Sequence, residues 1–198
     1  MSLHIDINKN LSSFNLDVSM ERKGGIIGFL GASGSGKTTI ANMREEKYGY
    51  RQLQSYTTRP PRSQNETGHI FITDVEFDNL QDIIAYTDYN NYRYCATAEQ
   101  ANNSDVYVID PAGIDYLKTH YKGKPIKIIN ITSPVHTKIN RMEQRGDAFN
   151  KIMERLLNDI DFRDFVGDFN ITNDDDTNLD ELVDKVHNWI EQQEKGLE

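Results

Sequence analysis

The chain has 198 residues, which is enough for one domain with a substantial core, and its 22 Lys and Arg against 31 Asp and Glu give a net charge of −9. This acidic balance argues against nucleic acid or an anionic membrane as the main partner. The single cysteine excludes an intrachain disulfide and favours a cytoplasmic protein, and no apolar run approaches the length of a membrane span. Small-molecule partners are therefore expected, and the oligomeric state is left open.

Two segments of alternating apolar and polar residues open the chain. They cover residues 3–8 and 14–20, with turn residues at 8–10 between them. The pattern predicts an antiparallel β-hairpin, which we assign to residues 1–22 as an addition that can cover a sheet edge.

A glycine-rich stretch follows the apolar run Ile26–Leu30, which is typical of a buried parallel strand. It matches the pattern G-x-x-x-x-G-K-[ST] completely and leads into a predicted helix. Such a loop can turn its backbone N–H groups toward a phosphate, while a lysine reaches the outer phosphates and a hydroxyl ligates Mg²⁺. The residues that would bind a nucleotide in this way are Gly31, Ala32, Ser33, Gly34, Ser35, Gly36, Lys37, Thr38 and Thr39. The alternative is a plain glycine-rich turn.

The middle of the chain predicts a small mixed α+β insertion over residues 55–103, which separates core segments 23–54 and 104–198. Two prolines between Arg59 and Arg62 argue against a central strand or helix there and hold both arginines on a loop. A guanidinium fork fits phosphate or carboxylate. The expected elements are strands at 50–54, 69–73, 83–87 and 92–97, and a helix at 75–80 capped by Asp74.

The remaining chain alternates strands with helices. The apolar strand 106–110 ends in Asp110, at the position where open α/β sheets place ligand-facing residues. The other expected elements are strands at 125–131 and 169–172 and three helices: one starts near 133, one runs through 153–156 to about 165, and one spans 179–192. Strands that alternate with helices around such a loop predict a three-layer α/β P-loop NTPase core with a parallel sheet.

Five further patterns follow the loop in order. They are Ser55-x-Thr57-Thr58-Arg59-x-x-Arg62, Asn91-Tyr92-x-Tyr94, Asp110-x-x-Gly113, Arg141-x-x-x-Arg145-Gly146 followed by Arg155-Leu156, and Ile171-x-Asn173-Asp174. With them the chain resembles the guanylate kinase family over about residues 24–195. That family transfers the terminal phosphoryl group of Mg·ATP to a nucleoside monophosphate, which implies ATP as co-substrate, Mg²⁺ as cofactor and a helical lid at about 141–155.

The resemblance also implies roles for single residues. Those expected at the acceptor are Ser55, Arg59, Arg62, His69, Tyr94, Thr97 and Asp110. Those expected to act on the migrating phosphoryl group are Lys37, Arg62, Arg141, Arg145 and Arg155. Asn173 would face adenine, Thr38 would bind Mg²⁺, and Asp110 would reach the metal through water. A loose phosphoryl-transfer transition state needs alignment and positive charge, which agrees with arginines concentrated in these loops.

The base pocket departs from the family pattern. Ala85 stands where the family has the glutamate that reads guanine, Ala96 replaces a small hydroxyl residue, and Val108 replaces an aspartate. His69 lies nearest to a tyrosine that has no counterpart here. Losing a carboxylate that accepts from the base should relax or shift base choice. GMP or dGMP is the first expected acceptor, and another nucleotide or a sugar phosphate is an alternative.

Two readings from other functional classes stay open. One is a catalytically idle guanylate kinase-like module that binds nucleotide and regulates a partner, which the altered base pocket favours. The other is an ATPase akin to transporter motors, because residues 3–40 also resemble the start of a molybdate-type ABC transporter ATPase. That second resemblance ends near residue 40, since no Leu-Ser-Gly-Gly-Gln sequence follows.

Overall fold

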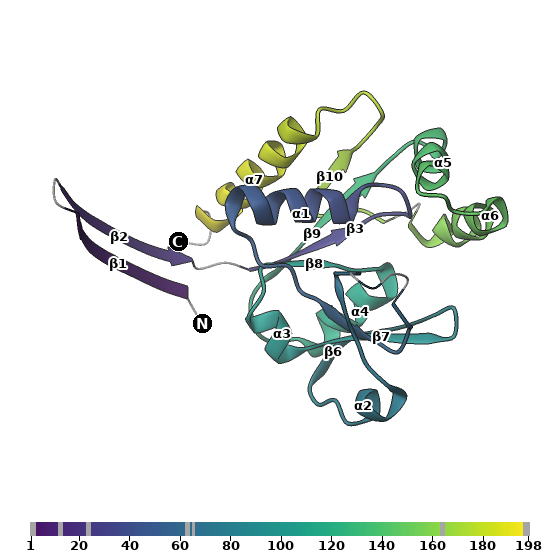
Figure 1. Ribbon diagram of the computed structural model, residues 1–198, viewed down its shortest axis with the longest axis horizontal. Helices are drawn as coiled ribbons and strands as arrows, with labels where there is room; N and C mark the ends of the chain where they lie inside the picture. Colours follow the sequence, from purple (N-terminus) through teal and green to yellow (C-terminus); the bar gives the residue numbers. More distant parts are fainter. Residues whose placement is uncertain are drawn as a thin grey trace.

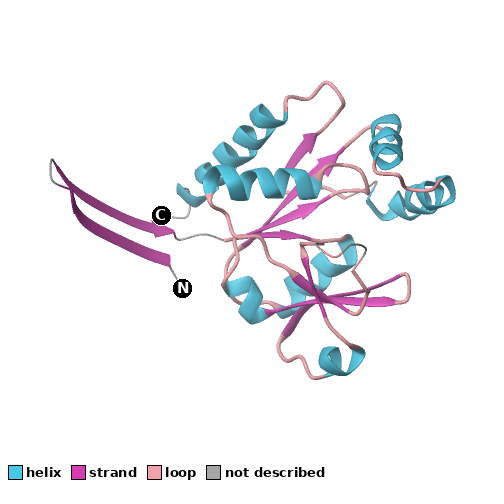
Figure 2. Ribbon diagram, viewed as in Figure 1, coloured by secondary structure: helices cyan, strands magenta, loops and turns pink. Residues whose placement is uncertain are grey.

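The fold is a three-layer α/β arrangement with a smaller mixed sheet beside it (Figures 1 and 2). It is seen in a computed structural model. Side chains are described from residue 25 onward, except that of Asp161. The described residues are 3–11, 14–22, 25–61, 64, 66–162 and 165–195.

The core is a four-stranded parallel sheet in the order β10-β9-β3-β8. Its strands are β3 (Ile26–Leu30), β8 (Val106–Val108), β9 (Ile126–Thr132) and β10 (Phe169–Thr172). This sheet confirms the predicted α/β P-loop NTPase-like core. Because the carboxyl ends of parallel strands share one edge, the loop after β3, Asp110 after β8 and Asn173 after β10 all lie at that edge.

Helices cover both faces of this sheet (Figure 1). Ile27 and Phe29 of β3 pack on α1 (Lys37–Tyr48) and α7 (Leu179–Lys195) in one buried cluster. Ile26 and Leu30 belong to a second cluster on the opposite face, with α4 (Pro111–His120). The period of two along a buried strand thus sends successive side chains into two separate apolar layers.

A second sheet, in the order β5-β4-β7-β6, packs against α4 through β6. Its strands are β4 (Ser55–Thr57), β5 (His69–Phe71), β6 (Ile83–Tyr89) and β7 (Tyr92–Thr97). The pairing of β4 with β5 is parallel, whereas β7 pairs antiparallel with both β4 and β6. The short helices α2 (Asp74–Asp78) and α3 (Ala98–Asn102) complete this part.

The structure corrects several expected boundaries here. Residues 55–57 form strand β4 because the two prolines begin only at Pro60, after the pairing has ended. The expected strand at 50–54 is reduced to one isolated bridge between Gln52 and Val106. Helix α2 is capped by Thr73, whose hydroxyl accepts from the Glu76 N–H in a capping box, and Asp74 lies inside the helix. Helix α3 was not expected from the sequence.

Two helices and a tight turn lie above the core sheet's carboxyl edge (Figure 1). They are α5 (Val135–Gln144), α6 (Phe149–Asn158) and the 3₁₀-helix η1 (Asp159–Phe162). The helix expected to run through Met153 to about Phe165 ends earlier, at Asn158, and tightens into η1 from Asp159. The expected lid at 141–155 spans the end of α5 and the first part of α6.

The N-terminal residues form the predicted hairpin. Strands β1 (Leu3–Leu11) and β2 (Phe14–Arg22) pair antiparallel in a two-stranded sheet of their own. Among the described residues, no helix is both long and apolar enough to cross a bilayer.

Candidate functional site

The glycine-rich loop runs from β3 to the first turn of α1, and Gly36 is the residue on which it depends most. Gly36 caps α1 with φ +92°, a conformation that L side chains rarely adopt. A Cβ placed there would lie 2.3 Å from Nδ2 of Asn173, which itself donates to the Ser35 carbonyl at 2.9 Å. The loop is thereby held against the end of β10, with its backbone N–H groups at a helix N-terminus.

Replacing Gly36 with alanine should destabilise the protein by about 2–4 kcal/mol, because it combines backbone strain with a clash against a buried amide. Gly49 is a matched control, since it also has positive φ (+66°) but nothing lies within 4 Å of the position that a Cβ would take. Gly49→Ala should cost only the strain, about 1 kcal/mol. Chemical denaturation of both variants tests this difference, and equal losses would contradict it.

The Lys37 ammonium points back into the loop. Its Nζ donates to the carbonyls of Gly31 at 2.6 Å and Ala32 at 3.0 Å. Burial lowers the pKa of Lys37 to about 8, and nearby carboxylates of Asp159 and Asp110 offset part of that effect. Lys37 is therefore a largely desolvated cation held by two loop carbonyls, in a position that suits an incoming phosphate.

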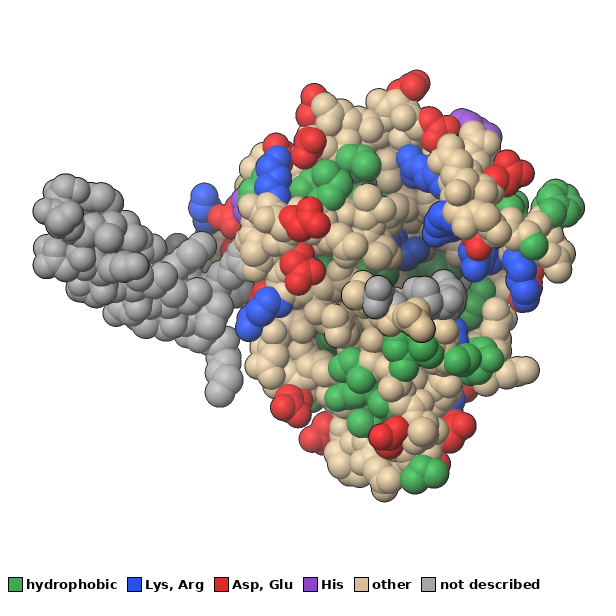
Figure 3. Space-filling view, viewed as in Figure 1, with side chains coloured by type: hydrophobic (Ala, Val, Ile, Leu, Met, Phe, Trp, Pro, Cys, Tyr) green, Lys and Arg blue, Asp and Glu red, His purple; other side chains and the backbone are tan. Residues whose placement is uncertain are grey.

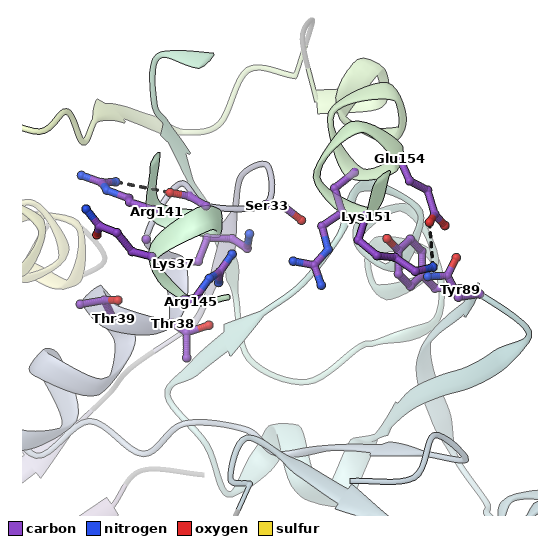
Figure 4. Close-up of a pocket in the computed structure, with 14 residues that line it drawn as sticks. Ser33, Lys37, Thr38, Thr39, Tyr89, Arg141, Arg145, Lys151 and Glu154 are labelled. Atoms are coloured by element: carbon purple, nitrogen blue, oxygen red, sulfur yellow. Dashed lines mark hydrogen bonds and ion pairs between the residues drawn. The ribbon is translucent and has the colours of Figure 1, made fainter. Parts of the chain in front are cut away.

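A cavity of about 680 Å³ opens over the loop, and we call it the loop cavity. Lys and Arg side chains gather around this hollow in the space-filling view (Figure 3). Lys37, Arg141 and Arg145 lie on one side of it, across from Lys151, Glu154 and Tyr89 (Figure 4). Its lining residues are Ser33, Gly34, Gly36, Lys37, Thr38, Thr39, Tyr89, Asn90, Arg141, Gln144, Arg145, Lys151, Glu154 and Arg155.

The three expected arginines reach this cavity in two different ways. Arg141 is braced by main-chain carbonyls, including those of Gly34 at 3.4 Å and Asp174 at 3.0 Å. Arg145 and Arg155 instead share the carboxylate of Asp147, at 3.4 and 2.6 Å. Arg141 is thus tied to the loop, whereas the other two hold a carboxylate that a phosphate can replace.

Asn173 is placed differently from the expectation that it faces adenine. Its side chain is 2% exposed and bridges the loop, donating to the Ser35 carbonyl and accepting from Arg141 at 3.3 Å. It does not line the loop cavity. Asn173 therefore supports the loop and Arg141, and a contact with adenine stays a prediction.

A second cavity of about 260 Å³ lies between the loop and the mixed sheet, and we call it the insertion cavity. It shares Ser33, Lys37 and Tyr89 with the loop cavity. Its lining residues are Gly31, Ser33, Lys37, Ser55, His69, Ala85, Tyr86, Thr87, Tyr89, Tyr94, Tyr107, Val108, Ile109, Asp110, Gly113 and Phe162. The two cavities thus share one lysine, which a ligand in either cavity can reach.

Polar groups in the insertion cavity form two hydrogen-bonded sets. Ser55 Oγ lies 2.9 Å from His69 Nδ1. One oxygen of Asp110 accepts from Thr87 Oγ1 at 3.0 Å and from the Gly113 N–H at 2.7 Å. The second contact caps α4, so the Asp110 carboxylate both stabilises the start of this helix and lines the insertion cavity.

Two of the expected acceptor residues are not brought into the insertion cavity. Arg59 and Thr97, both among the described residues, line neither cavity. Arg59 is buried and pairs with both oxygens of Glu66, at 3.2 and 2.7 Å. Thr97 caps α3, where its hydroxyl accepts from the Gln100 N–H. A third expected residue, Arg62, lies outside the described residues.

Sequence reasoning missed other residues of the site. Thr87, Tyr89 and Lys151 reach the cavities from β6 and α6, and a carboxylate from η1, Asp159, accepts from the Ser33 N–H at 3.3 Å. The acidic residues at 158–161 were visible in the sequence. Because a helix was expected to continue to about 165, the tight turn that brings Asp159 to the loop was not predicted.

Comparison with known proteins supports the fold. No protein-family model matches the chain, and no curated protein is significantly similar in sequence. A guanylate kinase from Anaplasma phagocytophilum is similar in structure, with a TM-score of 0.57 and 21% identity over 86% of each chain. A sugar kinase from Janibacter sp. HTCC2649 matches with a TM-score of 0.50 and 17% identity, over 85% of this chain and 95% of that one. The chain therefore has a kinase-like P-loop fold.

Proposed function

We propose that this protein is an ATP-dependent phosphotransferase that moves the terminal phosphoryl group of ATP to a phosphorylated small acceptor, with GMP or dGMP as the first candidate. The observation that carries the proposal is the meeting of the loop cavity and the insertion cavity at Ser33, Lys37 and Tyr89. In-line transfer needs the attacking and leaving oxygens on opposite sides of the transferred phosphorus, with cations around that phosphorus.

The chemistry needs position and charge. The bond between the terminal phosphorus and the bridging oxygen of ADP breaks, while a bond to an acceptor phosphate oxygen forms. That acceptor oxygen is already anionic, so no side chain has to remove a proton from it. Lys37, Arg145 and Arg155 line the loop cavity, and under this proposal they neutralise the charge on the migrating group.

Magnesium fits the oxygen ligands at this edge of the sheet. The Thr38 hydroxyl lines the loop cavity one residue after Lys37, and Asp110 uses one carboxylate oxygen for both of its hydrogen bonds. We propose that Thr38 holds Mg²⁺ on the donor phosphates and that Asp110 orients a water of the metal. Mg²⁺ would supply further neutralisation of phosphate charge.

The direct test is a transfer assay with Mg·ATP across GMP, dGMP, AMP, CMP, UMP and ribose phosphates. We expect at least one to yield ADP together with a phosphorylated product, and the preferred acceptor identifies the base or sugar. Thr87→Val should raise the KM for that acceptor more than it changes ADP binding, because Thr87 bonds Asp110 in the insertion cavity. No product from any acceptor would refute the proposal.

A second candidate function is a nucleotide-binding module without turnover. It is favoured by the walls of the insertion cavity, where Ala85 offers no polar group, and by Arg59, which is held by Glu66. Under this alternative the protein binds ATP but transfers no phosphoryl group to any acceptor. Calorimetry with ATP and the transfer assay together distinguish the two functions.

ATP affinity should fall as the pH rises through about 8. Burial lowers the pKa of Lys37 to about 8, so its ammonium is charged at pH 7 and loses its proton above that value. A phosphate favours the charged form, so the affinity should be constant between pH 7 and 7.5 and drop by up to about tenfold per unit above pH 8. Titration of wild-type protein and Lys37→Met tests this, because the variant should lack the drop. A flat wild-type profile to pH 9.5 would contradict it.

A further inference from the structure

Asp159 places a carboxylate against the glycine-rich loop. One of its oxygens accepts from the Ser33 backbone N–H at 3.3 Å, and the other accepts from Lys138 Nζ at 2.8 Å. Asp159 and Lys138 are only 7% and 8% exposed. We call the contact among Ser33, Lys138 and Asp159 the loop latch.

The loop latch lies where the two cavities meet. Ser33 lines both the loop cavity and the insertion cavity, next to Lys37. The Asp159 carboxylate is also close enough to oppose the effect of burial on the pKa of Lys37. A backbone N–H and an ammonium that face one carboxylate offer the same charge pattern as they would offer a phosphate oxygen.

Asp159 is connected to the cations of the lid. It directly follows α6, which carries Lys151 and Arg155 into the loop cavity, and it begins η1. Phe162, at the other end of η1, lines the insertion cavity. Because η1 is a single short turn, release of Asp159 frees the segment that links both cavities.

The position of Ser33 indicates which phosphate would meet Asp159. The N-terminus of α1, at Lys37 and Thr38, receives the inner phosphates in a loop of this pattern, and the lysine reaches outward to the last ones. Ser33 lies earlier in the loop and, unlike Thr38, lines the insertion cavity as well as the loop cavity. A diphosphate is long enough to fill the helix end, whereas a third phosphate extends toward Ser33 and brings its charge against the Asp159 carboxylate.

We propose that Asp159 is a specificity-determining residue that occupies the place of the donor's terminal phosphate, so that a nucleoside triphosphate displaces it from Ser33 and a diphosphate does not. This inference rests on the proposed function, in that the donor is ATP. Displacement releases η1 and α6 and so makes the arrival of the lid cations depend on a transferable phosphate. After transfer, ADP leaves the Ser33 N–H free, so the carboxylate returns to it.

The test compares the affinities of Mg·ADP and of a non-hydrolysable ATP analogue by calorimetry. Asp159→Asn removes the charge, and Lys138→Gln with Asp159→Asn replaces the buried ion pair by two neutral amides, in case the single variant leaves Lys138 buried without its partner and unfolds. Asp115→Asn, on the exposed side of α4, is the matched control for loss of one negative charge.

We expect the double variant to bind the ATP analogue at least fivefold more tightly than the wild type, with ADP affinity changed less than twofold. Hydrogen exchange should report the displacement directly: in the wild type, the analogue and not ADP should speed exchange over residues 159–162. In the double variant that exchange should be fast without nucleotide.

Two results would overturn the inference. Equal changes in the affinities of ADP and the analogue, or weaker binding of the analogue, would show that Asp159 does not compete with the terminal phosphate. In both cases normal binding by the wild type leaves the proposed function standing. Failure of the wild type to bind either nucleotide would remove the proposed function and this inference together.

Discussion

Replacing Lys37 with alanine should abolish measurable phosphoryl transfer, lowering kcat by about 10²- to 10³-fold or more, and should leave the fold intact. The ammonium donates to two loop carbonyls, those of Gly31 and Ala32, so its hydrogen bonds in the described part of the chain go to the main chain. Its removal therefore exposes carbonyls that water can reach, while the charge proposed to neutralise the donor phosphates is lost.

Lys124→Ala is the matched control for this variant. Lys124 is also a partly buried lysine whose Nζ donates to a backbone carbonyl, that of Ser104, at 2.8 Å. It lines neither cavity, so its removal should leave kcat unchanged. Steady-state assays and far-UV circular dichroism on both variants test the prediction. An unfolded Lys37→Ala protein, or one that retains wild-type kcat, would contradict it.

Replacing Arg155 with alanine should lower kcat by about 10²- to 10³-fold with a much smaller effect on ATP affinity. Its guanidinium lines the loop cavity and bonds to Asp147 at 2.6 Å, a carboxylate that also pairs with Arg145. When the Arg155 guanidinium leaves Asp147 and binds the migrating phosphoryl group, its positive charge would stabilise the transition state. Loss of an interaction that forms only in the transition state lowers kcat.

Arg51→Ala provides the control, because Arg51 also pairs with an aspartate, Asp105, at 3.3 Å and lines neither cavity. That variant should keep its kcat. Transfer rates under saturating ATP and acceptor measure both effects. If Arg155→Ala and Arg51→Ala behave alike, the Arg155–Asp147 pair is a surface ion pair worth under about 1 kcal/mol.

Much of the fold was accessible from local patterns. The apolar run at 26–30 predicted β3, and the glycines after it predicted the loop and the start of α1. These elements are consecutive in the chain, so local patterns suffice to place them next to one another. Asp110 was expected at the ligand-facing edge, because it follows a strand of the parallel sheet. Boundaries were less accurate where short-range signals competed, as at β4 and at the cap of α2.

The partners of the predicted site residues were not accessible in the same way. Arg59 and Arg155 both occur in expected motifs, yet one is held by Glu66 outside the cavities and the other faces the loop cavity. Arg59 pairs with a carboxylate seven residues away in the chain, and Arg155 pairs with one eight residues away. Which carboxylate each arginine meets depends on how the surrounding loops pack, and a residue pattern carries no information on that packing.

The sequence by itself determined that this chain places a glycine-rich loop at the edge of a parallel α/β sheet, since strand patterns and glycine conformations are local properties. Only the tertiary structure decided that two cavities meet at Lys37 and that Asp159 reaches Ser33 across 126 positions of the chain. Contacts of that range are set by the packing of η1 and α5 above the sheet, where burial and charge from distant segments act together.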